Sequence, residues 1–578
     1  MPADATLDPA GSSLLDGTAS GPAVAWRRAG VLLLAGFNLT LVQFLAMREI
    51  AALVGSNELV VMFVAGGYFV GLSAGYLVSE RLSPATLAGL GVGSLLWHAT
   101  TPFSVRAAAA WMISAGHSEL VPPFLGLLVV IGFGAFYAVF LPRLIEAHPD
   151  RVASPQRAMA RCYATELVGG ALGLLVILVV TPARMSWIAT MHLAGLALLL
   201  GLLLRVAAGG KVLLAAVPVA YVLVWPTADR ASLEAHFRAA HRWAESRVLA
   251  SEFSPYQRVD IVEARSRPGG GWSTNLYLNG NLLYGTRGLH RHNLMVAVMP
   301  NLMRPPGERR ALVIAGGSLD NARYLAPQVD QLHVVEIDEA VVRLSRRFLQ
   351  EPRGQFPTNW SLVIDDGKHF LGTWQGEPFD TIAVDVPVPT HLQTAMLHSE
   401  RFFALAKSRL RPGGVFSISL AGRLDARRPG TNSASGRLAE RIAAGLARQF
   451  EHVTVARLGG SDFAWASDRP LGQDLRALQA VADRFVATQP EGRQRFGQPR
   501  LKVLSPGLVS RQVAQVDPIR EADMQLVLRL SLNKLKRRFY SDDPHLEKPE
   551  GHGEGKSGHS HDGHEASDHE SGDHDEEP

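Results

Sequence analysis

Glycine and acidic residues recur directly after four predicted β-strands in the C-terminal half of the chain. They are Gly316 and Gly317 after the first strand, Glu336 after the second, Asp365 and Asp366 after the third, and Asp385 after the fourth. Glycine lets a backbone approach a ligand, an acid at the second position can accept both ribose hydroxyls, and an acid at the third can accept from an exocyclic amine. Ligands of open α/β sheets bind at the carboxyl ends of the strands, so the set predicts a nucleoside site. Each residue alone is equally typical of a turn, a helix cap or a solvated loop.

The strands that must position these residues belong to a parallel α/β sheet, because short β-rich runs alternate with helical patterns from about residue 254 onward. The predicted strands are Ala311–Ala315, His333–Val335, Ser361–Ile364, Thr381–Val384, Val415–Leu420, Val453–Ala456 and Phe463–Ala466. Val259–Val262 and Asn275–Leu278 predict a small hairpin ahead of them. We expect an N-terminal β region over 254–310, a Rossmann-type domain over 311–470 and a helical extension over 471–540.

The N-terminal half is too poor in charge for a soluble domain. Only 17 of the 200 residues from Ala29 to Ala228 are charged, against 19% of the whole 578-residue chain. This contrast excludes a purely cytosolic enzyme, and it also excludes a protein that lies wholly in the membrane. Seven uncharged stretches are long enough to span a bilayer, which takes about 17–25 residues. They are Ala29–Met47, Leu59–Ser79, Leu82–Val105, Leu120–Leu141, Leu167–Ala183, Met185–Leu204 and Val212–Ala228.

These stretches define the expected domain plan. We expect a disordered N-terminus over 1–28, a multi-span α-helical membrane domain of about seven helices over 29–228, and a linker over 229–253. The lipid bilayer is then a partner, and the expected location is a bacterial inner (cell) membrane that the chain crosses several times.

Small residues form stripes on two of the predicted spans. The stripe residues are Gly67, Gly71 and Gly75 on one span and Gly169 and Gly173 on another. Stripes of this kind let helices approach closely, either within one bundle or between the copies of a homo-oligomer. A substrate path would need charges inside the spans, but only His98 and His192 are ionisable well within them. Both are more typical of packed or interfacial histidines than of a proton relay, which disfavours a transporter.

The arginines at the ends of the spans indicate an orientation. Arg27 and Arg28 precede the first span, and Arg143, Arg151, Arg157 and Arg161 follow the fourth. Positive residues mark the cytoplasmic side, so the N-terminus is expected there. Seven spans would place the C-terminal half outside the cytoplasm, which conflicts with an enzyme that uses a cytosolic nucleoside. Either the number of spans is six or eight, or the soluble domain is exported.

The cysteine content and the net charge limit the kinds of metal site and of partner that we expect for the chain. The single cysteine, Cys162, excludes a disulfide framework and any cysteine-based zinc or iron–sulfur site. The net charge is +4, but residues 551–578 carry nine acids and one lysine, so the remaining residues are strongly basic. A basic body beside apolar spans favours contact with anionic lipid over nucleic acid.

The C-terminal tail, residues 541–578, is predicted to be disordered because it is polar and rich in histidine and acids. Its histidines include His559, His561 and His564. Imidazole is a ligand for zinc, nickel or copper, so a tail that buffers or senses a divalent metal is one interpretation. A solubilising tail is the other.

Residues 254–420 resemble the spermidine synthase family of aminopropyltransferases, which has the class I methyltransferase fold. The matching pieces are Ser254–Val259, Leu278–Gly280, Val335–Asp338, Asp365–Gly367, Phe379–Asp385, Ser399–Phe403 and Leu410–Gly414. The membrane half is similar to that of bacterial proteins in which a multi-span domain is fused to a spermidine synthase-like domain.

The resemblance implies an adenosyl sulfonium donor, decarboxylated S-adenosylmethionine or a relative of it, as a substrate. It implies that Glu336 binds the ribose, that Asp366 lies near the adenine amine, and that Asp385 helps to deprotonate the attacking amine. A carboxylate suits that last role because a primary amine is protonated at neutral pH and must lose a proton before it can attack.

The chain departs from the family pattern where a polyamine would bind. Four positions that the resemblance assigns to carboxylates are neutral, namely Ser318, Gly288, Leu294 and Val388. Each lost charge-assisted hydrogen bond costs roughly 1.5–3 kcal/mol in a dry pocket, so efficient turnover of putrescine is not expected. Nearby basic residues would suit a neutral or anionic acceptor, unless they are only exposed loop residues. They are Arg287, His290, Arg291 and His292.

Three functions follow from these patterns. The first is a membrane-anchored aminopropyltransferase-like enzyme with Asp385 as its base and a degenerate polyamine site. The second is a non-catalytic membrane sensor or scaffold that binds a nucleoside or a metal. The third, a transporter with a regulatory domain, is disfavoured by the scarcity of charges within the spans.

Overall fold

The computed structural model describes residues 12–15 and most of residues 21–539. Its internal gaps are 56, 117–120, 181–184, 205–207, 287–289, 305–306, 308, 350–357, 425–433, 473 and 490–491. The predicted tail, with His559, His561 and His564, lies outside the described residues. Residues 1–541 form one compact unit.

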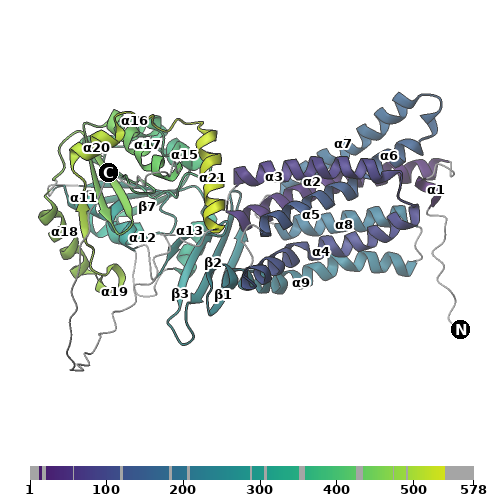
Figure 1. Cartoon of the computed structure of the whole chain (residues 1–578), viewed down its shortest axis with the longest axis horizontal. Helices are drawn as coiled ribbons and strands as arrows, with labels where there is room; N and C mark the ends of the chain where they lie inside the picture. The colour runs from purple at the N-terminus through teal and green to yellow at the C-terminus, as the bar shows by residue number, and fades with distance from the viewer. Residues whose placement is uncertain are drawn as a thin grey trace, which may run out of the picture. The chain divides into compact units, whose positions relative to one another are not determined.

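The N-terminal half is a bundle of long helices that lie side by side (Figure 1). The long helices are α2 (Pro22–Val54), α3 (Asn57–Ser79), α4 (Pro84–Ser114), α5 (Val121–Ala138), α7 (Pro155–Val180), α8 (Met185–Leu203) and α9 (Ala208–His241). Two short helices, α1 (Ser12–Leu15) and α6 (Phe140–Glu146), accompany them. In the described part of the chain, six helical segments are long and apolar enough to cross a membrane. The predicted third span, Leu82–Val105, forms most of α4 but is not among the six.

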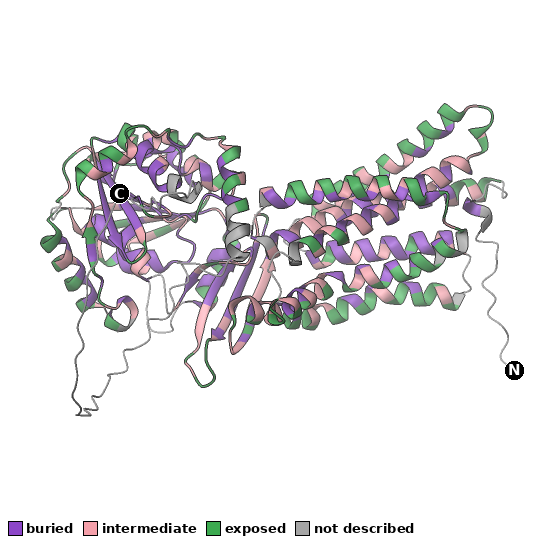
Figure 2. Ribbon diagram, viewed as in Figure 1, coloured by how far each residue is buried: buried purple, intermediate pink, exposed green. Residues whose placement is uncertain are grey.

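The helices of the bundle have exposed residues along their outer faces (Figure 2), and many of these exposed residues are large and apolar. Leu77, Leu178 and Leu223 are each at least three-quarters exposed. Water-soluble proteins rarely expose so much contiguous apolar surface, and helices in lipid do so as a rule.

The glycine stripes are used inside the bundle. A Cβ on Gly71 would lie 2.4 Å from the carbonyl oxygen of Ile131 on α5, and one on Gly169 would lie 1.9 Å from that of Leu33 on α2. Only glycine allows the helix backbones to approach so closely. The prediction of bundle packing is confirmed, and these glycines are therefore not a free surface for a second copy. A homo-oligomer through the glycine-rich helices stays a prediction.

The C-terminal half contains two sheets. The first is antiparallel, in the order β1 (Glu245–Phe253), β2 (Arg258–Arg265), β3 (Ser273–Leu278), β4 (Asn281–Gly285). The second has eight strands in the order β12-β10-β11-β9-β8-β5-β6-β7. Its strands are β5 (Arg310–Ile314), β6 (Gln331–Glu336), β7 (Trp360–Ile364), β8 (Phe379–Val384), β9 (Leu410–Ser419), β10 (His452–Leu458), β11 (Ser461–Ser467) and β12 (Leu501–Val503). Five neighbouring strands of this sheet, β9, β8, β5, β6 and β7, are parallel to one another, as a Rossmann-type sheet requires.

Helices cover both faces of the large sheet. On β5, Ala311 and Val313 join one core while Leu312 and Ile314 join the other, because successive side chains of a strand point to opposite faces. Residues of α11 (Met299–Leu302), α12 (Asp320–Leu325) and α18 (Leu475–Thr488) contribute to the first core. The second core includes residues of α14 (Gly367–Thr373), α16 (Glu400–Ser408), α17 (Ala434–Gln449), α20 (Pro506–Val513) and α21 (Met524–Phe539). The remaining helices are α10 (His290–Asn293), α13 (Glu339–Phe348), α15 (Leu392–Met396) and α19 (Gly492–Phe496).

Two predicted boundaries are wrong. Residues 22–28 were expected to be disordered, but they form the first turns of α2, which begins at Pro22. The expected linker over 229–253 is instead the end of α9 and strand β1, which pairs with β2 and gives the small sheet a strand before residue 254. The predicted extension over 471–540 is mainly helical and also contributes the edge strand β12.

Candidate active site

The predicted site residues meet at one edge of the large sheet. Strands β8, β5, β6 and β7 are neighbours and run parallel, so their carboxyl ends lie along the same edge. Asp385 follows β8, Gly316 and Gly317 follow β5, Glu336 ends β6, and Asp365 and Asp366 follow β7. The topology thus gathers residues that are up to 69 positions apart in the sequence.

The glycine loop and Glu336 form one tight unit. Gly317 donates its backbone N–H to Glu336 Oε2 at 3.0 Å, and a Cβ on Gly317 would lie 2.5 Å from that oxygen. Glu336 Oε1 accepts from the N–H of Asp338 at 3.1 Å. Burial raises the pKa of Glu336 to about 7, although the hydrogen bond from Asp338 acts in the opposite direction. The carboxyl is therefore held firmly at the strand end, where a ribose hydroxyl could meet it.

The loop begins with a strained residue. Ala315 has φ of 62°, in the left-handed region where a side chain is unfavourable. Its backbone N–H donates to the carbonyl of Val335 at 2.8 Å, which ties the loop to β6. The loop is thus fixed in a shape that glycine would adopt more easily.

The segment Ser254–Gln257 supplies polar contacts to Asp338, next to the strand end. Ser254 Oγ donates to Asp338 Oδ2 at 2.6 Å, and Gln257 Nε2 donates to the same oxygen at 3.2 Å. Burial raises the pKa of Tyr256, and so do the negative charges of four acids at the sheet edge. These are Asp338, Asp366, Asp365 and Glu336. Tyr256 therefore lies beside the predicted nucleoside site, although its role was not predicted from the sequence.

Asp365 and Asp366 serve partly as local structure. Asp366 Oδ1 accepts the N–H groups of Lys368 and His369 at 2.9 and 3.0 Å and caps α14. Asp365 Oδ2 lies 2.8 Å from His369 Nδ1. The cap was one of the alternatives open for Asp366, and it uses only one of the two carboxylate oxygens.

Asp385 is bound by two side chains that the sequence did not assign to it. Asn321 Nδ2 donates to Asp385 Oδ2 at 2.6 Å, and His292 Nε2 lies 2.9 Å from Asp385 Oδ1. Both partners come from elements beside the strand edge, α12 and α10. Leu294–Val298 continue α10 as a π-helical turn, a feature often found near functional sites. The two contacts thus fix the orientation of Asp385, and they place the His292 imidazole where a proton could pass between it and the carboxylate.

The other basic residues predicted near the acceptor are not all available. His290 is buried and contacts Asp320 and Tyr324, and Arg291 Nε donates to the carbonyl of Phe496 at 2.8 Å. Arg287 and Gly288 lie outside the described residues. His292, in contrast, contacts Asp385. The suggestion that His290 and Arg291 face an acceptor is therefore wrong, because both are used to fix α10.

The replaced acidic positions have different surroundings. Leu294 is fully buried in the first core and Ser318 is largely buried, whereas Val388 is 38% exposed. The side chain of Leu294 thus contributes to packing instead of to the edge of the site.

The described residues contain no group of three or more His, Cys, Asp or Glu placed to hold a metal ion. The predicted metal ligands of the tail lie outside that part of the chain, so metal binding there stays a prediction.

Several known proteins are similar in sequence to parts of this chain. Residues 290–421 match the family model described as "Spermine/spermidine synthase domain". A polyamine aminopropyltransferase of Mycobacterium tuberculosis is 27% identical over 447 residues, which are 74% of this chain and 82% of the relative. One from Corynebacterium efficiens is 34% identical over 173 residues, 29% of this chain and 31% of that protein. A solved spermidine synthase in complex with the transition state analogue AdoDATO is 23% identical, with a TM-score of 0.36, and covers 46% of this chain and 88% of that one.

The matched segment contains strands β5 to β9 and all the site residues from His292 to Asp385. The C-terminal half therefore contains a Rossmann-type domain that is similar to the spermine/spermidine synthase domain over residues 290–421.

Proposed function

We propose that the chain is a membrane-anchored transferase that moves an aminopropyl group from an adenosyl sulfonium donor, decarboxylated S-adenosylmethionine, to an amine. The observation that carries the proposal is the orientation of Asp385 by His292 and Asn321 at the strand end next to the Gly317–Glu336 unit. The names of the relatives and the matched domain support the same reaction class.

The donor would bind along the sheet edge. The loop at Gly316 and Gly317 would lie against the nucleoside, the Glu336 carboxyl would accept from the ribose, and Tyr256 would cover it. The helix cap uses only one carboxylate oxygen of Asp366, so the other oxygen would accept from the adenine amine.

The transfer step then needs a free amine beside Asp385. The amine nitrogen attacks the donor carbon, a C–N bond forms, and the C–S bond breaks with its electrons going to sulfur, which leaves as a neutral thioether. The nitrogen loses one proton, and Asp385 accepts it. Asp385 either keeps this proton or passes it to His292, whose Nε2 lies 2.9 Å from Asp385 Oδ1. Positioning the amine in line with the C–S bond supplies the rest of the acceleration.

The acceptor class follows from the charges present. A polyamine dication would find fewer carboxylates here than the family pattern provides, since positions 294 and 388 are leucine and valine. An acceptor with one amino group, close to the Asp385–His292 pair, requires less counter-charge. We therefore assign a monoamine acceptor in preference to putrescine.

The helical half would hold this domain at a membrane. The six apolar segments and the exposed leucines of their outer faces support insertion in a bilayer. The bilayer would then be the partner that covers those faces, and the expected location is a bacterial cell membrane.

The test is turnover by the full chain in detergent. Decarboxylated S-adenosylmethionine is mixed with putrescine or with propylamine, and release of methylthioadenosine is followed. We expect release with at least one amine, a preference for propylamine, and loss of release in Asp385→Asn with donor binding retained. Binding without release for any amine tested would favour the alternative, a non-catalytic nucleoside sensor, and no donor binding would refute both.

A further inference from the structure

Helix α2 contacts the nucleoside side of the sheet-edge site. Near the end of this helix, Arg48 donates to the carbonyl oxygens of Ser254 and Pro255, the second at 3.4 Å. The Arg48 guanidinium also lies 5.3 Å from the centre of the Phe253 ring. Tyr256, the next residue of this segment, lies beside the predicted nucleoside site. One wall of the site is therefore held against the end of a helix that is apolar enough to cross a membrane.

Helix α3 contacts the acceptor side of the site. Glu58, in its first turn, accepts the backbone N–H of Leu392 at 2.8 Å through Oε1, and its Oε2 lies 2.8 Å from His391 Nδ1. His391 ends the loop that begins at Asp385, and the chain between these two residues can span at most about 20 Å. Because α3 follows α2 in the chain, both walls of the site meet the same end of the bundle.

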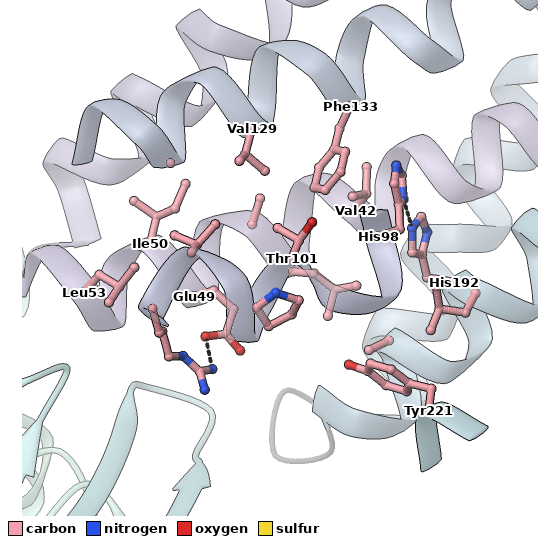
Figure 3. Close-up of a pocket in the computed structure, with 18 of the residues that line it drawn as sticks. Val42, Glu49, Ile50, Leu53, His98, Thr101, Val129, Phe133, His192 and Tyr221 are labelled. Atoms are coloured by element: carbon pink, nitrogen blue, oxygen red, sulfur yellow. Dashed lines mark hydrogen bonds and ion pairs between the residues drawn. The ribbon is translucent and has the colours of Figure 1, made fainter. Parts of the chain in front are cut away.

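A group of charged side chains lies at this end of the bundle. Arg106 contacts both Glu49 and Asp229 at 2.6 Å. Figure 3 shows the ion pair of Glu49 beside Ile50 and Leu53. Charged groups are costly at the centre of a bilayer and lie toward its surfaces. If the helices cross a bilayer, its headgroup layer therefore lies at the end of the bundle that meets the site.

Exposed apolar side chains accompany the site at the same end. Val388, Leu532 and Ile364 are between 38% and 45% exposed. Val388 lies in the loop that follows Asp385, and Ile364 directly precedes Asp365. Leu532 belongs to α21, which lies beside the start of α3 (Figure 1), and its neighbour Ser531 donates to the carbonyl of Thr390 in the same loop at 3.2 Å. The surroundings of the acceptor loop are thus partly apolar.

These surroundings favour an acceptor with one amino group and an apolar remainder. Asp385 can pair with one ammonium group, and the residue three places further along its loop is Val388 instead of an acid. A second ammonium group beside Val388 would lose water without gaining a counter-charge from that residue. A hydrocarbon chain at the same place would gain free energy by leaving water.

We propose that the acceptor is a long-chain primary amine that is embedded in the bilayer. Its amino group reaches Asp385, and its hydrocarbon chain runs past Val388 toward the lipid at the ends of α2 and α3. This inference rests on the proposed transferase function and names the acceptor class within it. The amine nitrogen forms a C–N bond with the donor carbon, the C–S bond breaks with its electrons going to sulfur, and Asp385 takes the proton from the nitrogen. The products are a long-chain secondary amine and a neutral thioether.

Turnover by the full chain in nanodiscs tests the acceptor class. Propylamine or dodecylamine is supplied with decarboxylated S-adenosylmethionine, and both the release of methylthioadenosine and the mass of the amine product are measured. We expect kcat/KM to be at least about tenfold higher for dodecylamine, because its longer chain buries more apolar surface. Equal values, or turnover of propylamine alone, would overturn the long-chain class and leave the transferase function standing. No release with either amine would refute both.

A substitution separates recognition by the loop from the enrichment of dodecylamine in lipid. Enrichment is the same for every variant, so it cancels when their preferences for dodecylamine over propylamine are compared. Val388→Asp should lower this preference at least about fivefold, because a carboxylate loses water against a hydrocarbon chain. Leu475→Asp, at a similarly exposed position in the first turn of α18, is the matched control and should keep the preference within about twofold.

An isosteric variant keeps the comparison decisive if Val388→Asp loses turnover of both amines. Val388→Thr keeps the shape of valine and adds a hydroxyl, so the preference for dodecylamine should fall about threefold. A wild-type preference in Val388→Asp, or in Val388→Thr where that variant decides, would refute the proposed path of the chain.

Discussion

His292 Nε2 lies 2.9 Å from Asp385 Oδ1, although the two residues are 93 positions apart in the chain. Neither side chain is fully enclosed, with exposed fractions of 28% and 16%. An imidazole against a carboxylate, open to one side, is an arrangement that can accept a proton and pass it to solvent. The pair is therefore the centre of the proposed chemistry.

Replacing His292 tests this role. His292→Asn leaves the base Asp385 in place but removes the imidazole that takes the proton from it, so kcat should fall about 10–100-fold while KM for the donor stays within about twofold. The acid limb of the pH–rate profile should also move, which a purely structural role would not produce. His452→Asn, on β10, is the control and should behave like wild type.

Glu336 predicts a pH-dependent stability. Burial raises its pKa from 4.5 to about 7, so the folded state favours the protonated acid. The stability that the protonated Glu336 contributes to the folded state is complete below about pH 4.5 and is lost as the pH rises through about 7. The free energy of unfolding should fall by about 3 kcal/mol over this range. Urea unfolding at pH 5 and pH 8 should show this difference in wild type and a much smaller one in Glu336→Gln. Glu339→Gln, at an exposed position of α13, should keep the wild-type difference.

Ala315 predicts a stabilising substitution. Its left-handed backbone costs about 1 kcal/mol with a side chain present, and Ala315→Gly would remove that cost. The greater freedom of glycine in the unfolded chain offsets part of the gain, so the net increase in unfolding free energy should be about 0.5 kcal/mol. Thermal unfolding of the two proteins measures it. Ala340→Gly in α13 should have the opposite sign, since its backbone is helical.

The bundle predicts that the two ends of the chain lie on opposite sides of the membrane. Arg27 Nε donates to the carbonyl of Leu202 at 3.2 Å, so the start of α2 lies beside the end of α8, just before α9 begins. At the other end, Arg106 of α4 joins Glu49 of α2 and Asp229 of α9. Helix α4 thus runs along the bundle as a seventh long helix, although it is not among the six apolar segments, and we expect it to be a seventh pass.

Reporter fusions check this topology. The arginines near the start of α2 and those from α6 to the first turns of α7 favour a cytoplasmic N-terminus. Alkaline phosphatase fused after residue 541 should then be active and a fluorescent protein there dark, with the reverse at the N-terminus. Reporters that place both ends on the same side would contradict a seven-pass bundle. The expected result would mean that the donor must be supplied outside the cytoplasm.

The strands and acids of the site were predictable because each leaves a local signal. The runs from Ala311 to Val384 alternate with helices, and an acid or glycine follows each predicted strand, so β5 to β8 and their ends were confirmed. The pairing in the sheet then placed Glu336, Asp365 and Asp385 along one edge.

The partners of those acids could not be predicted, because they depend on packing between distant segments. Asn321 reads as an ordinary residue in the first turn of a helix, and no local pattern links it to Asp385. Tyr256 belonged to a recognised sequence piece, and a tyrosine beside a predicted nucleoside site was the one signal that could have identified it. Strand β1 was missed since its residues, Glu245–Phe253, mix charged and apolar residues in no clear alternation.

The direction in which the His292 side chain points depends on the number of residues in the π-helical turn at Leu294–Val298, which directly follows α10. Such a turn holds one residue more than the α-helix it interrupts. Deleting a single residue from the turn would restore ordinary helical winding and rotate α10 by about 100° relative to the buried segment that follows. His292 would then face away from Asp385 with no change in its identity, so the imidazole–carboxylate pair depends on the length of this turn as well as on the two residues that form it.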